Sequence, residues 1–167
     1  MKVKNMKLFL ILFLSMVFAL SLDSCKKAEE LPGFNAVIGE GANNVALFKS
    51  YIEKCGGFEA AQIVDIRSEE LYIKGHISGA KNISARTESA DKDNIFEDKS
   101  AFDIFNKNKP IFIYGESGLN YDYLAPAYIA TIFGKNNTCV LTGGGFEKWK
   151  EASTNDPSYK ITKGKNP

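Results

Sequence analysis

The stretch that decides the fold is residues 64–84, which read VDIRSEELYIKGHISGAKNIS. Its first residues belong to a β-branched run at 62–67 (QIVDIR), which predicts a strand. A short helix is expected to begin near Ser68 and to end at Gly75, and residues 80–84 (AKNIS) predict a second, brief strand. Strands separated by a helix indicate parallel pairing through right-handed crossovers.

The sequence on both sides of this stretch continues the alternation of helices and strands. The apolar run IFIY lies between Pro110 and Gly115, and a continuous apolar run of this kind suits a strand that is covered on both faces of a sheet. The sequence therefore predicts a single α/β domain, with a small parallel sheet and helices on both faces. The further elements that we expect are helices at 46–55, 123–133 and 146–152 and strands at 111–114 and 138–141.

Three motifs give the chain a resemblance to a known family. Residues 64–84 are similar to the first signature of rhodanese-like domains, in which Asp-x-Arg ends a strand and Gly-His-Ile-x-Gly-Ala follows a short acidic helix. IFIYGESG at 111–118 resembles the strand that leads into the family's active-site loop. VLTGGGFEKW at 140–149 resembles its last strand, its glycine turn and a helix whose Trp149 we expect to pack on the sheet. Order and spacing agree over 34–152, which implies the fold of the sulfurtransferase superfamily.

The matching polar residues are predicted to be structural. Gly75 and Gly79 flank His76 in a turn where glycine tolerates positive φ, and His76 is expected to hydrogen-bond nearby backbone. Asp65 and Arg67 are two residues apart, so on a strand they share a face and can hold neighbouring loops through hydrogen bonds. Gly143-Gly144-Gly145 lacks the spacing of a phosphate-binding loop and predicts a tight strand-to-helix turn.

The loop after the strand at 111–114 departs from the pattern of active members. The resemblance implies that a catalytic cysteine follows this strand directly, where loop amides stabilise its thiolate and its persulfide. In this chain Gly115 stands at the position of that cysteine. Asn120 stands at the sixth loop position, where sulfurtransferases often carry arginine. We therefore expect neither sulfur transfer nor the phosphatase chemistry that uses the same cysteine, and with a single histidine in the chain Ser117 has no evident base. An alternative is that the loop amides bind an anion weakly, although the negative charge of Glu116 opposes such binding. The degenerate loop consists of Gly115, Glu116, Ser117, Gly118, Leu119 and Asn120.

The segment after the loop contains a proline at an unusual place. Pro126 lies beyond the first turn of a helix that would start directly after the loop, and proline is tolerated mainly in that turn. Either the helix begins near Asp122, which leaves Tyr121 and Tyr123 in a longer loop, or the helix is kinked. In a longer loop the two tyrosines would be candidates for a contact surface.

The N-terminus has the pattern of an export signal. A basic start precedes an apolar run at 8–22, and the following Leu-Asp-Ser-Cys resembles a bacterial lipobox, which implies cleavage before Cys25 and acylation of that cysteine. The alternatives are a secreted protein that is cleaved nearby and a retained membrane helix. We expect a lipid-anchored protein of the cell envelope that is exposed outside the cytoplasm. The predicted organisation is a signal peptide at 1–24, a tether at 25–33, a rhodanese-like domain at 34–160 and a polar tail at 161–167.

Charge and cysteine content narrow the function classes. With 21 basic and 20 acidic residues and no long block of either sign, the chain lacks the footprint of a nucleic-acid binder. No cofactor or metal site is expected. In an oxidising compartment Cys55 and Cys139 either form a disulfide or remain as buried thiols.

Three functions remain in competition. The first is a non-catalytic binding or scaffolding module for an unidentified envelope protein, with the degenerate loop and the tyrosines as its contact surface. The second is a sulfurtransferase that uses a non-standard cysteine such as Cys139. The third is a purely structural envelope lipoprotein.

Overall fold

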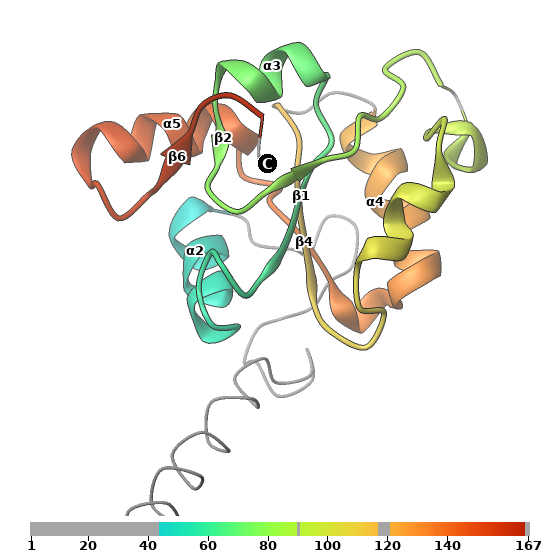
Figure 1. Ribbon diagram of the computed structural model, residues 1–167, viewed down its shortest axis with the longest axis horizontal. Helices are drawn as coiled ribbons and strands as arrows, with labels where there is room; N and C mark the ends of the chain where they lie inside the picture. The colour runs from blue at the N-terminus through green and yellow to red at the C-terminus, as the bar shows by residue number, and fades with distance from the viewer. Residues whose placement is uncertain (1–43, 90, 117–120, 166–167) are drawn as a thin grey trace, which may run out of the picture.

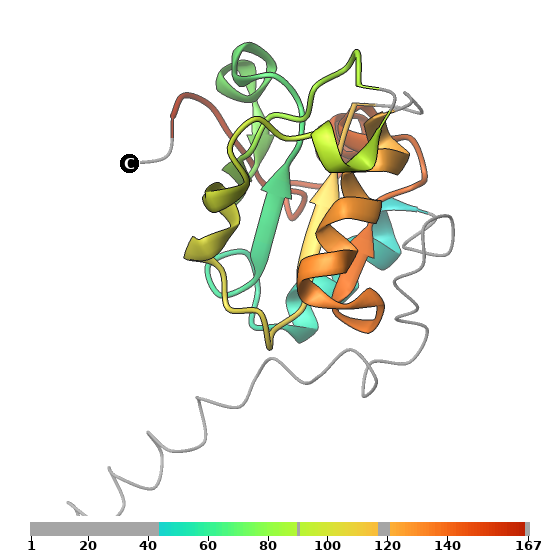
Figure 2. The ribbon, with the colours of Figure 1, turned by 90° about the vertical axis from the view of Figure 1, so that its right-hand side faces the viewer.

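The centre of the molecule is a four-stranded parallel sheet. The computed structural model describes residues 44–89, 91–116 and 121–165. Its strands lie in the order β3-β1-β4-β5, and every neighbouring pair is parallel. Figures 1 and 2 show the sheet with helices packed on both of its faces, as the sequence predicts. The strands are β1 (Gln62–Asp65), β3 (Lys81–Asn82), β4 (Ile111–Tyr114) and β5 (Thr138–Val140).

The two middle strands are buried along nearly their whole length. All residues of β4 and the last three of β1 are buried. The register pairs Asp65 with Tyr114 and Phe112 with Cys139. Because the strands are parallel, Asp65 and Tyr114 lie at the carboxyl edge of the sheet, while Cys139 lies two residues before that edge on β5.

The helices divide between the two faces of the sheet (Figure 1). One face carries α2 (Val45–Lys54) and α5 (Gly145–Asn155), and the other carries α4 (Tyr121–Phe133) with the 3₁₀ segments η2 (Lys92–Asn94) and η3 (Lys99–Ile104). Side-chain caps begin several of them. Asn44 accepts from the amide of Leu47 to start α2, and Ser68 accepts from that of Leu71 to start α3 (Glu69–Lys74).

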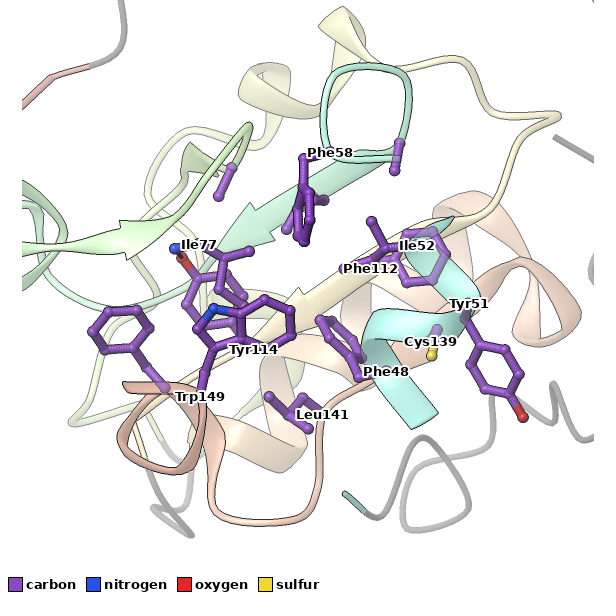
Figure 3. Packing of buried hydrophobic residues seen from close by; sticks show 14 of the residues in the cluster. Phe48, Tyr51, Ile52, Phe58, Ile77, Phe112, Tyr114, Cys139, Leu141 and Trp149 are labelled. Atoms are coloured by element: carbon purple, nitrogen blue, oxygen red, sulfur yellow. Dashed lines mark hydrogen bonds between the residues drawn. The ribbon is translucent and has the colours of Figure 1, made fainter. Parts of the chain in front are cut away.

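An aromatic core joins α2 and α5 to the sheet (Figure 3). The ring of Phe48 meets Phe112 and Trp149 edge to face, with centroids 5.7 and 6.3 Å apart. Trp149 is fully buried and its indole N–H donates to the carbonyl of Lys160 at 3.3 Å. The expected role of Trp149 in packing the last helix on the sheet is therefore confirmed.

Residues 161–164 belong to the fold, which corrects this part of the tail predicted at 161–167. Ile161 and Thr162 form strand β6 (Ile161–Thr162), which pairs antiparallel with β2 (His76–Ile77). Ile161 packs against the aromatic core, and the amide of Gly164 donates to the carbonyl of Ile73 at 2.9 Å. A two-residue strand between lysines carries too little apolar pattern to be predicted, since only its partner strand provides the hydrogen bonds.

The start of α4 corrects a second expectation. The helix begins at Tyr121, so neither Tyr121 nor Tyr123 lies in a longer loop, and the start at Asp122 is wrong. Pro126 lies inside the helix, in its second turn and buried. Proline costs the helix one backbone hydrogen bond. Burial of Ala125, Ile129 and Phe133 on the same helix offsets that loss.

Several sequence predictions fall on residues that the structure does not describe. They concern the signal peptide, the lipidation site Cys25 and the tether, and also Ser117, Gly118, Leu119 and Asn120 of the loop. Within residues 44–89, 91–116 and 121–165, no helix is long and apolar enough to cross a membrane.

Candidate functional site

Polar side chains gather at the carboxyl edge of the sheet, where β1, β3 and β4 end. Asp65 closes β1, Arg67 follows it, and Gly115 follows β4. Asn82 at the end of β3 donates to the carbonyls of Asp65 and Arg67, at 3.0 and 2.8 Å. Ligands of open parallel sheets commonly bind at this edge, so these residues define the candidate site.

A buried ion pair forms its centre. The Arg67 side chain is only 2% exposed and that of Asp65 is not exposed at all. Arg67 Nη2 donates to Asp65 Oδ2 at 2.6 Å, and Nε donates to Oδ1 at 3.0 Å. Nη2 also donates to the carbonyl of Gly75 at 2.7 Å, which ties the end of α3 to β1. The expectation that this pair holds neighbouring loops is confirmed.

Tyr114 extends the network across to β4. Its hydroxyl donates to Asp65 Oδ2 at 2.7 Å and accepts from the amide of Ile77 at 3.0 Å. Complete burial and the adjacent carboxylate of Asp65 raise the pKa of Tyr114 well above its ordinary value. The hydroxyl is therefore a fixed donor at neutral pH.

The guanidinium of Arg67 is also stacked on an aromatic ring. Its central carbon lies 3.8 Å from the ring centroid of Phe146, the second residue of α5. Burial alone would lower the pKa of Arg67, but the hydrogen bonds and charge of Asp65 outweigh it and raise the pKa above its usual value. Arg67 is thus a permanent cation whose position is fixed by β1, α3 and α5.

Glu116 supplies a second carboxylate to the same cation. Arg67 Nη1 donates to Glu116 Oε2 at 3.0 Å, and the Glu116 side chain is 27% exposed. One cation therefore faces two carboxylates, so the charge of this cluster is net negative. An inorganic anion would find the accessible edge of Arg67 already occupied by a carboxylate of the loop itself.

Gly115 stands where the resemblance places a catalytic cysteine, and α5 holds it there. Gly115 is buried, and its carbonyl accepts from the amide of Phe146 at 2.9 Å. Gly145 has φ +55°, and a Cβ on it would meet the carbonyl oxygens of Glu116 and, at 2.6 Å, Gly115. Only glycine at 145 permits this close approach between α5 and the start of the loop.

His76 has the structural role that the sequence predicts, although it lies in β2 rather than in a free turn. Its ring is buried, stacks on Tyr72 with centroids 3.8 Å apart, and places Nδ1 3.0 Å from the carbonyl of Tyr72. Of the two flanking glycines, Gly79 has φ +81° while Gly75 has φ 162°, which is extended. Gly79 therefore uses the conformation that favours glycine in this turn, whereas Gly75 does not, because β2 begins directly after it.

The remaining predicted residues lie apart from this cluster. Tyr123 is 53% exposed on α4. Cys55 and Cys139 are buried thiols without a disulfide between them, 0% and 2% exposed, in the core between the sheet and α2. Figure 3 shows Cys139 beside Tyr51, within that core. In the described part of the chain, no cluster of His, Cys, Asp and Glu side chains could hold a metal ion.

An open groove adjoins the cluster between α3, α5 and β6, and we name it the α3–α5 groove. Its volume is about 800 Å³. Arg67, Phe146 and Glu116 line it, and Leu71, Lys150 and Lys163 stand around them. The buried cation Arg67 and its partly exposed partner Glu116 therefore both form part of the wall of this groove.

A comparison with protein-family models matches residues 47–152 to the rhodanese-like domain. The chain belongs to the rhodanese-like domain family. The matched residues of this rhodanese-like domain span the four-stranded sheet, α3, α4 and most of α2 and α5. No curated protein sequence matches the chain.

Similar solved structures differ from the chain considerably in sequence. The BH2092 protein of Bacillus halodurans is 26% identical, with a TM-score of 0.47, and the match covers 62% of this chain and 67% of that one. The rhodanese-like domain of the Alr3790 protein from Anabaena sp. is 22% identical, with a TM-score of 0.43 and coverage of 67% and 74%. A rhodanese with anions from E. coli is 19% identical, with a TM-score of 0.37 and coverage of 63% and 100%.

The structure adds three residues to this rhodanese-like site that sequence reasoning missed. Tyr114 and Phe146 were predicted only as parts of elements, and Glu116 was considered only as an obstacle to anions. Their contacts with Asp65 and Arg67 join residues about 50 to 80 positions apart in the chain. The sequence offered one hint of these contacts. Glu116 follows the strand at 111–114 almost directly and Arg67 follows the strand before it, so the two charges could meet at the same edge of the sheet.

Proposed function

We propose that this rhodanese-like protein is a binding module, anchored to a membrane of the cell envelope, that does not transfer sulfur. The observation that carries the proposal is the pair Gly115 and Glu116. At the position of the expected nucleophile there is no side chain, and the next residue places a carboxylate on the buried cation Arg67. Sulfur transfer needs a nucleophilic sulfur, and the capture of thiosulfate needs positive charge that is free to meet it.

The alternative of a sulfurtransferase with a displaced cysteine has little support from the geometry. Cys139 is 2% exposed and pairs in register with Phe112, three residues before Gly115. Because a strand rises about 3.3 Å per residue, Cys139 lies about 10 Å from the start of the loop along the strand direction. Cys55 is fully buried in the same core.

The proposed contact surface lies around the carboxyl edge of the sheet. Tyr123, on the first turn of α4 directly after the loop, exposes half of its side chain. Aromatic side chains with a polar tip are frequent energetic centres of protein interfaces. Tyr121 precedes it at the start of the same helix and is included in the proposal.

The proposed anchor is the acylated Cys25. Two or three acyl chains hold a protein stably on a bilayer, which a single chain does not. The predicted tether at 25–33 extends at most about 3.3–3.6 Å per residue, so the domain and its partner would meet within about 30 Å of the lipid.

Two measurements test the proposal. The full chain, purified in detergent, is expected to form no thiocyanate from thiosulfate and cyanide, with an active sulfurtransferase assayed in parallel. Thiocyanate formation that Cys139→Ser abolishes would establish the enzyme instead. Metabolic labelling with a fatty acid tests the anchor, since Cys25→Ser is expected to remove the label.

The contact surface is tested by crosslinking in isolated membranes. Tyr123→Ala is expected to reduce the yield of crosslinked partner. Ile104→Ala is the matched control, because Ile104 is also an exposed apolar side chain but lies shortly before β4, at the opposite edge of the sheet. Equal yields for the two variants would remove Tyr123 from the surface.

A further inference from the structure

We propose that the α3–α5 groove binds an acidic peptide segment of a partner protein, one of whose carboxylates replaces Glu116 on Arg67. The inference rests on the proposed binding function and adds to it a site and the chemistry of its ligand. It depends on the way in which Arg67 divides its donors between two carboxylates.

The two carboxylates are held very differently. Asp65 is fully buried, and it accepts from the backbone amide, Nε and Nη2 of Arg67 and from the hydroxyl of Tyr114. Glu116 is 27% exposed, and within the described part of the chain its carboxylate contacts only Arg67 Nη1. Asp65 is therefore a permanent partner, whereas Glu116 is the exchangeable one.

The exchange would leave no buried charge alone. Arg67 lines the groove although only 2% of its side chain is exposed, so a ligand can meet it only at its Nη1 edge. Stacking on Phe146 and the bonds to Asp65 and the Gly75 carbonyl keep the guanidinium in place during the exchange. An incoming carboxylate accepts the same hydrogen bond while Glu116 moves into solvent. Charge-assisted bonds of this kind are about twice as strong as neutral ones.

The charges around the groove favour an acidic segment. Among the described residues, Lys150 and Lys163 make no ion pair, and both line the groove. Two of its other charged residues already have partners outside it, since Lys74 pairs with Glu70 and Glu151 with Lys148. Glu147 is the remaining anion on the wall. While Glu116 is paired with Arg67, the uncommitted charges of the groove are therefore two lysines against one glutamate, which is net positive.

The shape also suits a peptide rather than a small ion. A volume of about 800 Å³ is within the range of pockets that hold drug-sized ligands, and the groove extends along α5 from Phe146 to Thr154. Leu71 and Ile161 offer apolar surface between the charged residues. A segment of a few residues could therefore place one carboxylate on Arg67 and a second near Lys150 or Lys163.

The test uses the full chain in detergent and two fluorescein-labelled probes, tetraglutamate and tetraglutamine, in fluorescence anisotropy at physiological salt. Tetraglutamate is expected to bind and tetraglutamine not. Glu116→Gln removes the internal competitor at constant size and is expected to bind tetraglutamate about tenfold more tightly, which corresponds to about 1.4 kcal/mol. Lys150→Gln and Lys163→Gln are expected to weaken binding several-fold. Lys109→Gln, which removes an exposed lysine just before β4, is the control and should leave binding unchanged.

Two results would overturn the inference. Absence of tetraglutamate binding to both the wild type and Glu116→Gln would exclude the groove as an acidic-peptide site. Binding that weakens equally in Lys109→Gln and Lys150→Gln, with no gain in Glu116→Gln, would indicate nonspecific attraction. Neither result would affect the proposed function, which fails separately if the chain forms thiocyanate or if crosslinking yields no partner.

Discussion

Replacing Gly145 by alanine tests whether α5 positions the start of the degenerate loop. Gly145 has φ +55°, and a Cβ there would overlap the carbonyl oxygen of Glu116 and lie 2.6 Å from that of Gly115. The obstacles are backbone atoms, which cannot rotate away as the end of a side chain would. The loop and α5 must therefore separate.

The loss of folding free energy in Gly145→Ala has two parts. A left-handed backbone costs a residue with a Cβ about 1–2 kcal/mol. Separation of the loop from α5 also weakens the 2.9 Å hydrogen bond from the amide of Phe146 to the carbonyl of Gly115, at about 1 kcal/mol, and strains the stacking of Phe146 on Arg67. We expect Gly145→Ala to lower the free energy of unfolding by about 3–4 kcal/mol.

Gly57→Ala is the matched control, because Gly57 has φ +83° shortly after the end of α2 but nothing lies within 4 Å of its Cβ position. It should cost only the backbone part, about 1–2 kcal/mol. Urea unfolding followed by the fluorescence of Trp149, the only tryptophan of the chain, measures both variants. Equal losses for the two would refute the reasoning, since they would show that the loop does not press on α5.

The remaining predictions concern the buried network and the thiols. Arg67→Met leaves Asp65 without its counter-ion and should cost about 3–5 kcal/mol, while the double variant with Asp65→Asn should recover part of that loss in urea unfolding; no recovery would mean that the ion pair is not the cause. Tyr114→Phe should cost about 1–3 kcal/mol at neutral pH. Because the pKa of Tyr114 is raised in the folded state, its share of stability is complete below its unfolded value of about 10 and declines above it, so the stability of the wild type should fall more between pH 9 and 11 than that of Tyr114→Phe. In a Cys25→Ser chain, Cys55 and Cys139 should react with a thiol reagent only after unfolding, and rapid reaction in the native state would contradict their burial.

Local patterns were enough to predict most elements of the fold. β4 is a continuous apolar run, α3 has a serine cap and a final glycine, and α2 ends at a pair of glycines, so each element is specified by its own residues. β6, which has no such local pattern, was missed, and the start of α4 was misplaced although the helix itself was predicted. β6 exists because β2 lies beside it, and α4 continues through Pro126 because its buried face packs on the sheet.

For the site, the sequence by itself determined that Gly115 stands in place of the expected cysteine, and the two-residue spacing of Asp65 and Arg67 predicted that they would act together, although β1 ends at Asp65. Both inferences follow from residue identity and from the two-residue period of a strand. Only the tertiary structure decided that Glu116 lies on Arg67, that Tyr114 donates to Asp65 and that Phe146 stacks on the guanidinium. These contacts join residues far apart in the chain, and their geometry arises only when β1, β4 and α5 meet at the carboxyl edge of the sheet.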